Sequence, residues 1–280
     1  MSEEHKCDGN CSTCAHREEE EQQNCQIHKA LEHVKNKIVV MSGKGGVGKS
    51  SVAVNLALGL ALQGLKVGLL DIDIHGPSVP KMLGLDGESV MTTGEKLLPV
   101  PYGSMKVMSI GFLLETESMA IVWRGAKKAA VITQFLTDVE WGELDYLIID
   151  APPGTGDEPL SICQLLPSPT GAVIVTTPQS VAALDVAKSL SFCELLKFPV
   201  LGVVENMSGF VCPHCGTVTD IFSAGAGERL AQQFHVPLLA KVPLDPLVCQ
   251  SGDSGKPVIA ANPNSPTAQA LQKLVEAVMQ

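Results

Sequence analysis

An octapeptide in the first fifth of the chain has the residue types and spacing of a complete phosphate-binding loop. Residues 43–50 read Gly-Lys-Gly-Gly-Val-Gly-Lys-Ser, with Lys44 as a second lysine besides the usual Lys49. The glycines let backbone N–H groups turn toward phosphate oxygens, and the N-terminus of the following helix adds roughly half a positive charge. Lys49 is expected to neutralise the β- and γ-phosphates, and the Ser50 hydroxyl to ligate Mg²⁺. The pattern predicts a nucleotide site that includes Gly43, Lys44, Gly45, Gly46, Val47, Gly48, Lys49, Ser50 and Ser51.

Two further segments place carboxylates at the ends of apolar, strand-like runs. In Leu-Leu-Asp-Ile-Asp-Ile-His, residues 69–75, strand alternation puts Asp71 and Asp73 on the same face. In residues 147–157, Asp150 precedes a loop rich in proline and glycine. Ligands of open α/β folds bind at such strand ends, where carboxylates hold Mg²⁺ and orient the attacking water. Asp150 matches a Walker B carboxylate; ordinary acidic residues at strand ends are the alternative for each segment taken alone.

Cys212 and Cys215 form a CxxC pair whose short loop lets two thiolates converge on one metal. Two ligands do not complete a tetrahedral site, so either a second chain's pair or the amino-terminal cysteines must complete it. These residues favour neither an iron-sulfur cluster nor zinc, because four cysteines serve both. His214, between the two, is interpreted as an exposed spacer.

Four more cysteines stand near the amino terminus, in a segment with almost no aliphatic residue to bury. They are spaced Cys7-x3-Cys11-x2-Cys14-x10-Cys25, which is enough for a separate Cys₄ site. We expect residues 1 to about 28 to be an appendage that is ordered by a metal or not at all. The alternatives are a second cluster, a zinc site, and a flexible thiol arm that hands iron or clusters to Cys212 and Cys215.

The segments between these motifs alternate between strand and helix patterns. Runs rich in Val, Ile and Leu, typical of strands buried on both faces of a parallel sheet, lie near residues 37–42, 66–71, 145–150, 171–176, 200–205 and 237–242. Crossover helices are expected near residues 48–63, 126–139, 180–196, 225–234 and 265–279. Gly, Pro and Thr clusters predict an insertion with a hairpin at residues 86–124.

The predicted fold class is α/β, a P-loop NTPase with a mostly parallel sheet and helices on both faces. A flexible cysteine-rich segment is expected at residues 1–36, and an ATPase domain at residues 37–280 with a CxxC insertion at residues 209–219. The chain of 280 residues, 45% of them apolar, is long enough for one large α/β core. Its formal charge of −10 does not favour nonspecific attraction to nucleic acid or to an anionic membrane. Because the sequence has neither a membrane-length apolar run nor a signal-like start, we expect a cytoplasmic protein.

Several strings together resemble those of a known family. Lys44, the Asp71 and Asp73 pair, and Asp-Ala-Pro-Pro-Gly at residues 150–154 look like the deviant Walker A ATPases, which include MinD, ParA and the nitrogenase iron protein. Further strings are similar to the Mrp/ApbC/Nbp35-type iron-sulfur cluster carriers, at residues 73–78, 122–125, 151–157, 176–180 and 205–209. One departure is Ala126, where that family pattern leads us to expect proline.

The resemblance implies roles for particular residues. Lys44 would reach across a homodimer to the partner's nucleotide, so that two chains enclose two ATP molecules. Asp73 would position or activate water, and the catalytic set would be Lys44, Lys49 and Asp73. Ser50 and Asp71 would serve Mg²⁺, with Asp150 close to the ion. Asn206 would contact the adenine, with Pro243 and Asp245 nearby.

The resemblance also favours an iron-sulfur reading of the cysteines. Cys212 and Cys215 of two chains would hold one bridging [4Fe-4S] cluster, and Cys7, Cys11, Cys14 and Cys25 would be candidates for a second. The implied function is a homodimeric ATPase that receives a cluster from donors and transfers it to apo-proteins, with neither nucleic acid nor membrane as partner.

Two other functions compete with this one. A MinD- or ParA-like positioning ATPase with a structural zinc knuckle would use a basic amphipathic helix or a basic surface. The helix expected at residues 265–279 has an apolar face but a single base, Lys273, so core packing is favoured. A redox enzyme like the nitrogenase iron protein is disfavoured. Each chain of that protein also gives two cysteines, but they are far apart along the sequence, whereas Cys212 and Cys215 are close together.

Overall fold

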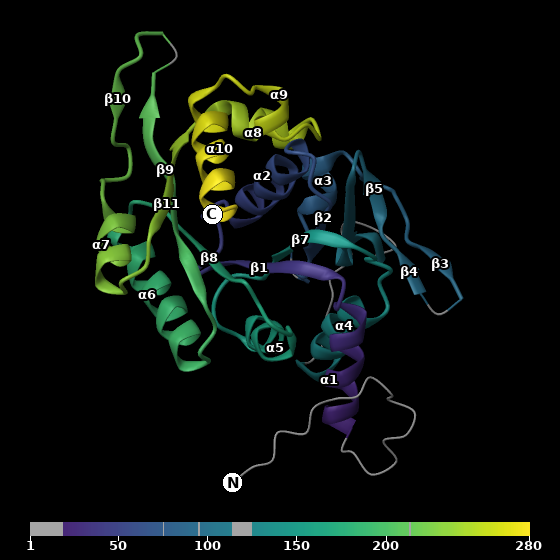
Figure 1. The fold of residues 1–280 in the computed structure, drawn as a ribbon. Helices are drawn as coiled ribbons and strands as arrows, with labels where there is room; N and C mark the ends of the chain where they lie inside the picture. Colours follow the sequence, from purple (N-terminus) through teal and green to yellow (C-terminus); the bar gives the residue numbers. More distant parts are fainter. Residues whose placement is uncertain (1–18, 75, 95, 114–124, 213) are drawn as a thin grey trace.

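A mostly parallel sheet organises the protein. The computed structural model describes residues 19–74, 76–94, 96–113, 125–212 and 214–280, without the side chains of residues 19–21 and 125–127. Within these residues a nine-stranded sheet is covered by helices on both faces (Figure 1). The strand order is β10-β9-β8-β1-β7-β2-β6-β5, with β11 paired to β9 beside this path. The predicted α/β architecture is confirmed.

Six parallel strands form the centre of this sheet. They are β1 (Val34–Ser42), β2 (Val67–Asp71), β7 (Leu144–Asp150), β8 (Gly171–Thr176), β9 (Val200–Val211) and β11 (Leu238–Leu244). All six were predicted from their apolar runs, although β9 continues six residues beyond the expected end. Because parallel strands end at one edge, Ser42, Asp71 and Asp150 come to lie at the same edge of the sheet.

Shorter strands lie at the two margins. β6 (Met105–Ser109) runs parallel to β2 and forms a hairpin with β5 (Val100–Tyr102). A separate hairpin joins β3 (Met91–Thr93) to β4 (Lys96–Leu98), which confirms the hairpin predicted within residues 86–124. A 3₁₀ helix, η2 (Ile110–Leu113), follows β6, and at the other margin β10 (Val218–Thr219) pairs antiparallel with β9.

One face of the sheet is covered by α2 (Lys49–Leu62), α3 (Val79–Leu83), α8 (Pro246–Asp253), α9 (Val258–Ala261) and α10 (Pro266–Val278) (Figure 1). Ile38 and Val40 of β1 pack with α2 and α10 in this half of the core. The apolar face of α10 is buried, with Ala268, Leu271, Leu274 and Val275 at most 3% exposed. The prediction that this face packs in the core is confirmed. No helix within the described residues is both long and apolar enough to span a bilayer.

The opposite face is covered by α1 (Glu19–Ala30), α4 (Gly125–Thr137), α5 (Asp157–Leu165), α6 (Ser180–Leu195) and α7 (Ala226–Gln233). Val39 and Met41 of β1 point to this side, since successive side chains of a strand alternate between faces. The crossover helices α2, α4, α6, α7 and α10 match the five predicted ones. The short helices α3, α5, α8 and α9 were not predicted.

The described part of the amino-terminal segment differs from the expectation that it is ordered by a metal or not at all, because it forms a helix that packs on the core. Helix α1 packs on α4, with Gln23 Nε2 donating to Thr133 Oγ1 at 2.7 Å. Ile27 and Leu31 are 0% and 1% exposed, so two aliphatic side chains one turn apart anchor this polar helix to the core. Cys25, in the same helix, is 7% exposed. Cys7, Cys11 and Cys14 lie outside the described residues.

Candidate functional site

The phosphate-binding loop connects β1 to α2 with a backbone that requires glycine. A Cβ atom at Gly43 would lie 2.3 Å from the carbonyl carbon of Asp185 on α6, because the loop begins in contact with that helix. Gly48, at the start of α2, has φ +81°, a conformation that side chains other than glycine's rarely adopt. The predicted strand, loop and helix context is therefore present.

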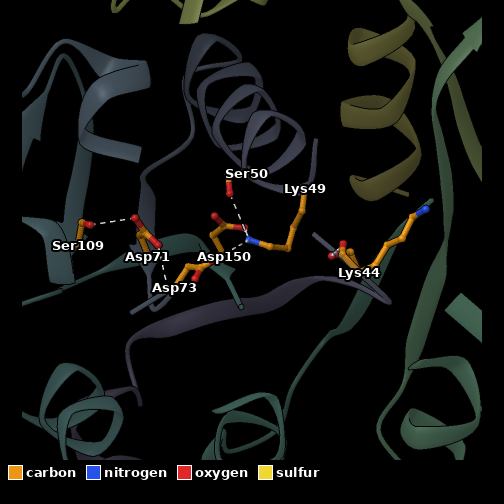
Figure 2. A network of polar contacts seen from close by, with 8 residues as sticks. Lys44, Lys49, Ser50, Asp71, Asp73, Ser109 and Asp150 are labelled. Carbon is orange, nitrogen blue, oxygen red and sulfur yellow. Dashed lines mark hydrogen bonds and ion pairs between the residues drawn. The ribbon is translucent and has the colours of Figure 1, made fainter. Parts of the chain in front are cut away.

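Lys49 lies at the centre of a buried polar cluster (Figure 2). Its Nζ is 2.6 Å from Asp150 Oδ1, 3.7 Å from Asp73 Oδ2 and 3.1 Å from Ser50 Oγ. The side chain of Lys49 is 6% exposed and that of Asp150 is 0% exposed. The structure therefore brings the two predicted carboxylate segments to the phosphate loop, where they neutralise the charge of Lys49.

Asp71 is fully buried next to this cluster. It accepts hydrogen bonds from the Asp73 backbone N–H at 3.0 Å and from Ser109 Oγ at 2.9 Å. Burial, assisted by the nearby negative charge of Asp150, raises the pKa of Asp71 to about 7. The sequence motifs did not identify Ser109. It ends β6 directly beside Asp71 in the strand register, so a polar residue at the end of a neighbouring strand is the pattern that could have indicated it.

The carboxylate and hydroxyl oxygens in this cluster are suitable ligands for Mg²⁺. Asp150 Oδ2 is buried and has no hydrogen-bond partner among the described residues, so it has a free acceptor position. Burial raises the pKa of Asp150 against the opposing effect of Lys49, and a divalent cation would favour its ionised form. Carboxylate and hydroxyl oxygens are the ligands that Mg²⁺ takes in nucleotide sites. Ser50, Asp71 and Asp150 are thus suited to hold the ion, directly or through water.

Lys44 lies on a different side of the loop. Its side chain extends away from Lys49 and from the three carboxylates (Figure 2). The carbonyl oxygen of Lys44 accepts a hydrogen bond from Ser42 Oγ at 3.0 Å, which fixes the loop backbone beneath it. Within its own chain, Lys44 is therefore not aimed at the cluster around Lys49.

Asn206 lies beside the part of the loop that leads into α2. Pro243 lies in β11, the strand paired with that of Asn206, and Asp245 directly follows β11. Asn206 Nδ2 donates to the carbonyl oxygen of Val47 at 2.8 Å, so this amide supports the loop backbone. Asp245 caps α8 by accepting from Leu247 N–H at 2.9 Å and also accepts from Thr267 Oγ1 at 2.9 Å. A cavity of about 390 Å³ is lined by Pro243, Asp245 and neighbours from β9 and α8. Since both Asp245 oxygens are engaged, any base contact in this cavity would come from other atoms of the segment.

The CxxC pair lies on a hairpin that extends from the sheet. Beyond Asn206, β9 passes through Met207 and Gly209, both with positive φ, and its register with β11 shifts there. Cys212 N–H donates to the carbonyl of Thr217 at 3.0 Å and closes the hairpin. Cys212 is half-buried, whereas Cys215 and the predicted spacer His214 are exposed.

The environment of Cys215 favours its thiolate. The side chain of Thr217, with its Oγ1 3.3 Å from Cys215 Sγ, and the Thr217 backbone hydrogen-bond the sulfur and lower the pKa of Cys215. No group of three or more His, Cys, Asp or Glu residues is placed to hold a metal within the described part of the chain. Within the described residues, the hairpin therefore presents two thiols with no further candidate ligands gathered around them.

Comparison with known proteins agrees with this geometry. The family model of NUBPL iron-transfer P-loop NTPases, of the ParA group, matches residues 33–279. The chain belongs to this family. It is 46% identical to the iron-sulfur cluster carrier protein of Methanocaldococcus jannaschii over 98% of this chain and 97% of the relative. It is 53% identical to the cytosolic Fe-S cluster assembly factor CFD1 of Saccharomyces cerevisiae over 78% of this chain and 76% of the relative.

Solved structures support the same placement. A nucleotide-binding protein from Archaeoglobus fulgidus, in complex with ADP, superposes with a TM-score of 0.74 at 43% identity, over 83% of this NUBPL-family chain and 91% of that one. The septum site-determining protein MinD of Pyrococcus horikoshii has a TM-score of 0.67 at 23% identity and shares the fold. The resemblance to the deviant Walker A group and to iron-sulfur carriers is thus confirmed.

Proposed function

We propose that this NUBPL-family P-loop NTPase is a homodimeric, cytoplasmic ATPase that carries a [4Fe-4S] cluster between its chains and transfers it to apo-proteins. The observation that carries this proposal is the incomplete CxxC site on an exposed hairpin. Two thiols, one with a lowered pKa, are presented without further ligands gathered among the described residues. A second copy of the hairpin would supply the two thiolates that a Cys₄ cluster still needs. The names of the M. jannaschii and S. cerevisiae relatives support an iron-sulfur cargo over zinc.

The nucleotide would enter by exchanging the partners of Lys49. In the structure this lysine pairs with Asp150, with Nζ and Oδ1 2.6 Å apart. Phosphate oxygens of ATP would take over Lys49 and the backbone N–H groups of the loop, leaving Asp150 and Asp71 to serve Mg²⁺, which supplies positive charge to the phosphates. Asp73, beside Lys49, would orient a water whose oxygen bonds to the γ-phosphorus as the bond from that phosphorus to the β–γ bridging oxygen breaks, with the protons of the water ending on the released phosphate.

Lys44 would act on the other chain's nucleotide. Its side chain extends away from the carboxylates of its own chain, and that direction suits a residue whose target lies across an interface. One dimer interface would then complete both the ATPase site and the cluster site. Opening that interface after hydrolysis would expose a cluster held by only two thiolates per chain, which favours transfer over storage.

The amino-terminal cysteines are candidates for a second cluster. Cys25 is fixed in α1, so Cys7, Cys11 and Cys14 would have to approach this helix to share a metal with it. The partners in this account are cluster donors and apo-proteins, with no role for nucleic acid or membrane.

The assignment is tested by anaerobic reconstitution with iron and sulfide. The double variant Cys212→Ala/Cys215→Ala should lose the bridging cluster, measured as iron and sulfide per dimer, while ATP binding persists. Cys249→Ala, which removes an exposed thiol outside the hairpin, is the matched control and should keep the wild-type content. Unchanged cluster content in the double variant would remove the hairpin from the cluster site.

A further inference from the structure

A second cavity opens at the phosphate end of the site, away from the predicted adenine side. Its volume is about 470 Å³, and its lining consists of Asp73, Gly76, Lys128, Pro152, Pro153 and Glu158. Asp73 belongs to both this cavity and the cluster around Lys49, since its Oδ2 is 3.7 Å from Lys49 Nζ. The cavity therefore adjoins the region into which the terminal phosphate of a bound triphosphate would project.

An ion pair that is largely removed from water forms one wall of this cavity. Lys128 Nζ, from α4, is 2.6 Å from Glu158 Oε1, from the first turn of α5, and the two side chains are 15% and 10% exposed. Desolvating two charges costs free energy that their attraction does not necessarily recover, so such a pair adds little stability compared with apolar packing. A lysine held at this depth beside a nucleotide site is better explained by a need for positive charge.

An excess of negative charge at the phosphate end of the site explains why a further cation is needed there. The carboxylates of Asp71, Asp73 and Asp150 already lie there around a single loop lysine, and a triphosphate adds further negative charge. A preorganised cation aimed at the terminal phosphate would lower the energy of the bound triphosphate and of the charge that develops during transfer. ADP, which lacks that phosphate, would gain little from it.

We propose that Lys128 binds the γ-phosphate of ATP in its own chain, and that Glu158 holds the lysine in place when this phosphate is absent. This rests on the proposed ATPase function and adds a phosphate-binding residue to it. Glu158 lies in the first turn of α5, two residues after the loop of residues 151–156 that follows Asp150. Transfer of Lys128 from Glu158 to the phosphate would therefore change a contact at the start of α5 only when a triphosphate is bound. Through this change the loop after Asp150 would distinguish ATP from ADP.

The experiment compares the binding of AMP-PNP and ADP, each with Mg²⁺, by isothermal titration calorimetry on the full chain. Lys128→Met should weaken AMP-PNP binding by at least about tenfold and ADP binding by less than about twofold, since one charge-assisted contact is lost. Lys128→Arg should retain most of the AMP-PNP affinity. Glu158→Gln should keep or increase it, because the lysine loses a competing carboxylate.

The exposed pair of Lys66 Nζ and Glu143 Oε2, 2.8 Å apart at the opposite edge of the sheet, provides the matched controls Lys66→Met and Glu143→Gln. Neither should alter the affinity for either nucleotide. An unchanged ratio of AMP-PNP to ADP affinity in folded Lys128→Met would overturn the inference. If that variant does not fold, a Glu158→Gln variant with a lowered ratio would overturn it instead. Failure of the wild type to bind either nucleotide would contradict the ATPase proposal itself.

Discussion

The nucleotide pocket and the cysteine hairpin are built in opposite ways. Around Lys49 the side chains are buried and paired, and Asp150 is 0% exposed at the end of a central strand. The hairpin has a two-residue strand, an exposed Cys215, and apolar side chains in solvent, with Val218 and Ile221 65% and 52% exposed. The pocket is preorganised by the core of one chain, whereas the hairpin has little core of its own.

This difference indicates where a second chain would contribute in the proposed dimer. The pocket already contains Lys49 and carboxylates that could bind Mg²⁺, and we propose that it lacks only the partner's Lys44. The hairpin would depend on a partner for half of its ligands and for cover of its apolar side chains. Changes in the pocket should therefore impair nucleotide chemistry strongly, while changes in the hairpin should spare the stability of the chain and affect the cargo and the dimer.

The largest contrast is expected from Lys49→Ala. Loss of this buried cation should reduce ATP hydrolysis by at least about 100-fold, the scale of removing one preorganised charge-stabilising group. The variant should still acquire iron and sulfide on reconstitution, because the hairpin thiols are untouched. Phosphate release and iron content measured on the same preparation check both parts, and a parallel loss of cluster would show that the two sites do not separate.

Gly43→Ala probes the rigidity of the pocket without a change of charge. The added methyl group would lie 2.3 Å from the Asp185 backbone, so the loop or α6 must shift, at a cost of about 1–3 kcal/mol in the free energy of unfolding. Gly45→Ala in the same loop is the control, because its Cβ would meet Pro153 Cγ at 4.0 Å. Denaturant unfolding without nucleotide gives the comparison, and equal stabilities would contradict the described contact with α6.

The raised pKa of Asp71 makes the pocket pH-sensitive. Because burial lifts this pKa to about 7, the unfolded chain releases the proton near pH 4 while the folded chain keeps it until about pH 7. Stability from this group is full below about pH 4 and is lost as the pH rises toward 7, at up to about 1.4 kcal/mol per pH unit. Asp71→Asn should flatten that slope in urea unfolding series, and a slope identical to the wild type would exclude Asp71 as its source.

The smallest effect is expected on the hairpin. Val218→Thr keeps a β-branched side chain at a position that is 65% exposed, so the free energy of unfolding of the isolated chain should change by less than about 0.5 kcal/mol. If Val218 is covered by a partner, the same variant should weaken the dimer, measured by sedimentation at a series of concentrations. A large loss of stability in the monomer would contradict the view of the hairpin as a segment with little core.

Local patterns predicted the strands, the phosphate loop and the strand-end carboxylates well. Parallel pairing then forces Asp71 and Asp150 to one edge, so their convergence followed from the fold class. Features that depend on packing between distant segments were not predictable. Helix α1 depends on two aliphatic residues, Ile27 and Leu31, that meet α4, and the pairing of Lys128 with Glu158 joins two helices separated by a strand.

The same reasoning explains the outcome at Asp245. The family resemblance places this residue near the adenine, but it also has the sequence position of a helix N-cap. The cap and Thr267 occupy both oxygens in the structure. Local helix chemistry thus engages the side chain that the family resemblance had placed near adenine.

The central claim, that one dimer interface completes the cluster site, is tested most directly by counting iron per dimer. In a Cys7→Ser/Cys11→Ser/Cys14→Ser background, anaerobically reconstituted protein should sediment as a dimer with about four iron atoms per two chains, the content of one Cys₄-held cluster. Adding Cys212→Ala/Cys215→Ala should remove both the iron and the cluster-dependent gain in dimer. Four iron atoms on a monomer, or iron retained after loss of both hairpin thiols, would contradict the account.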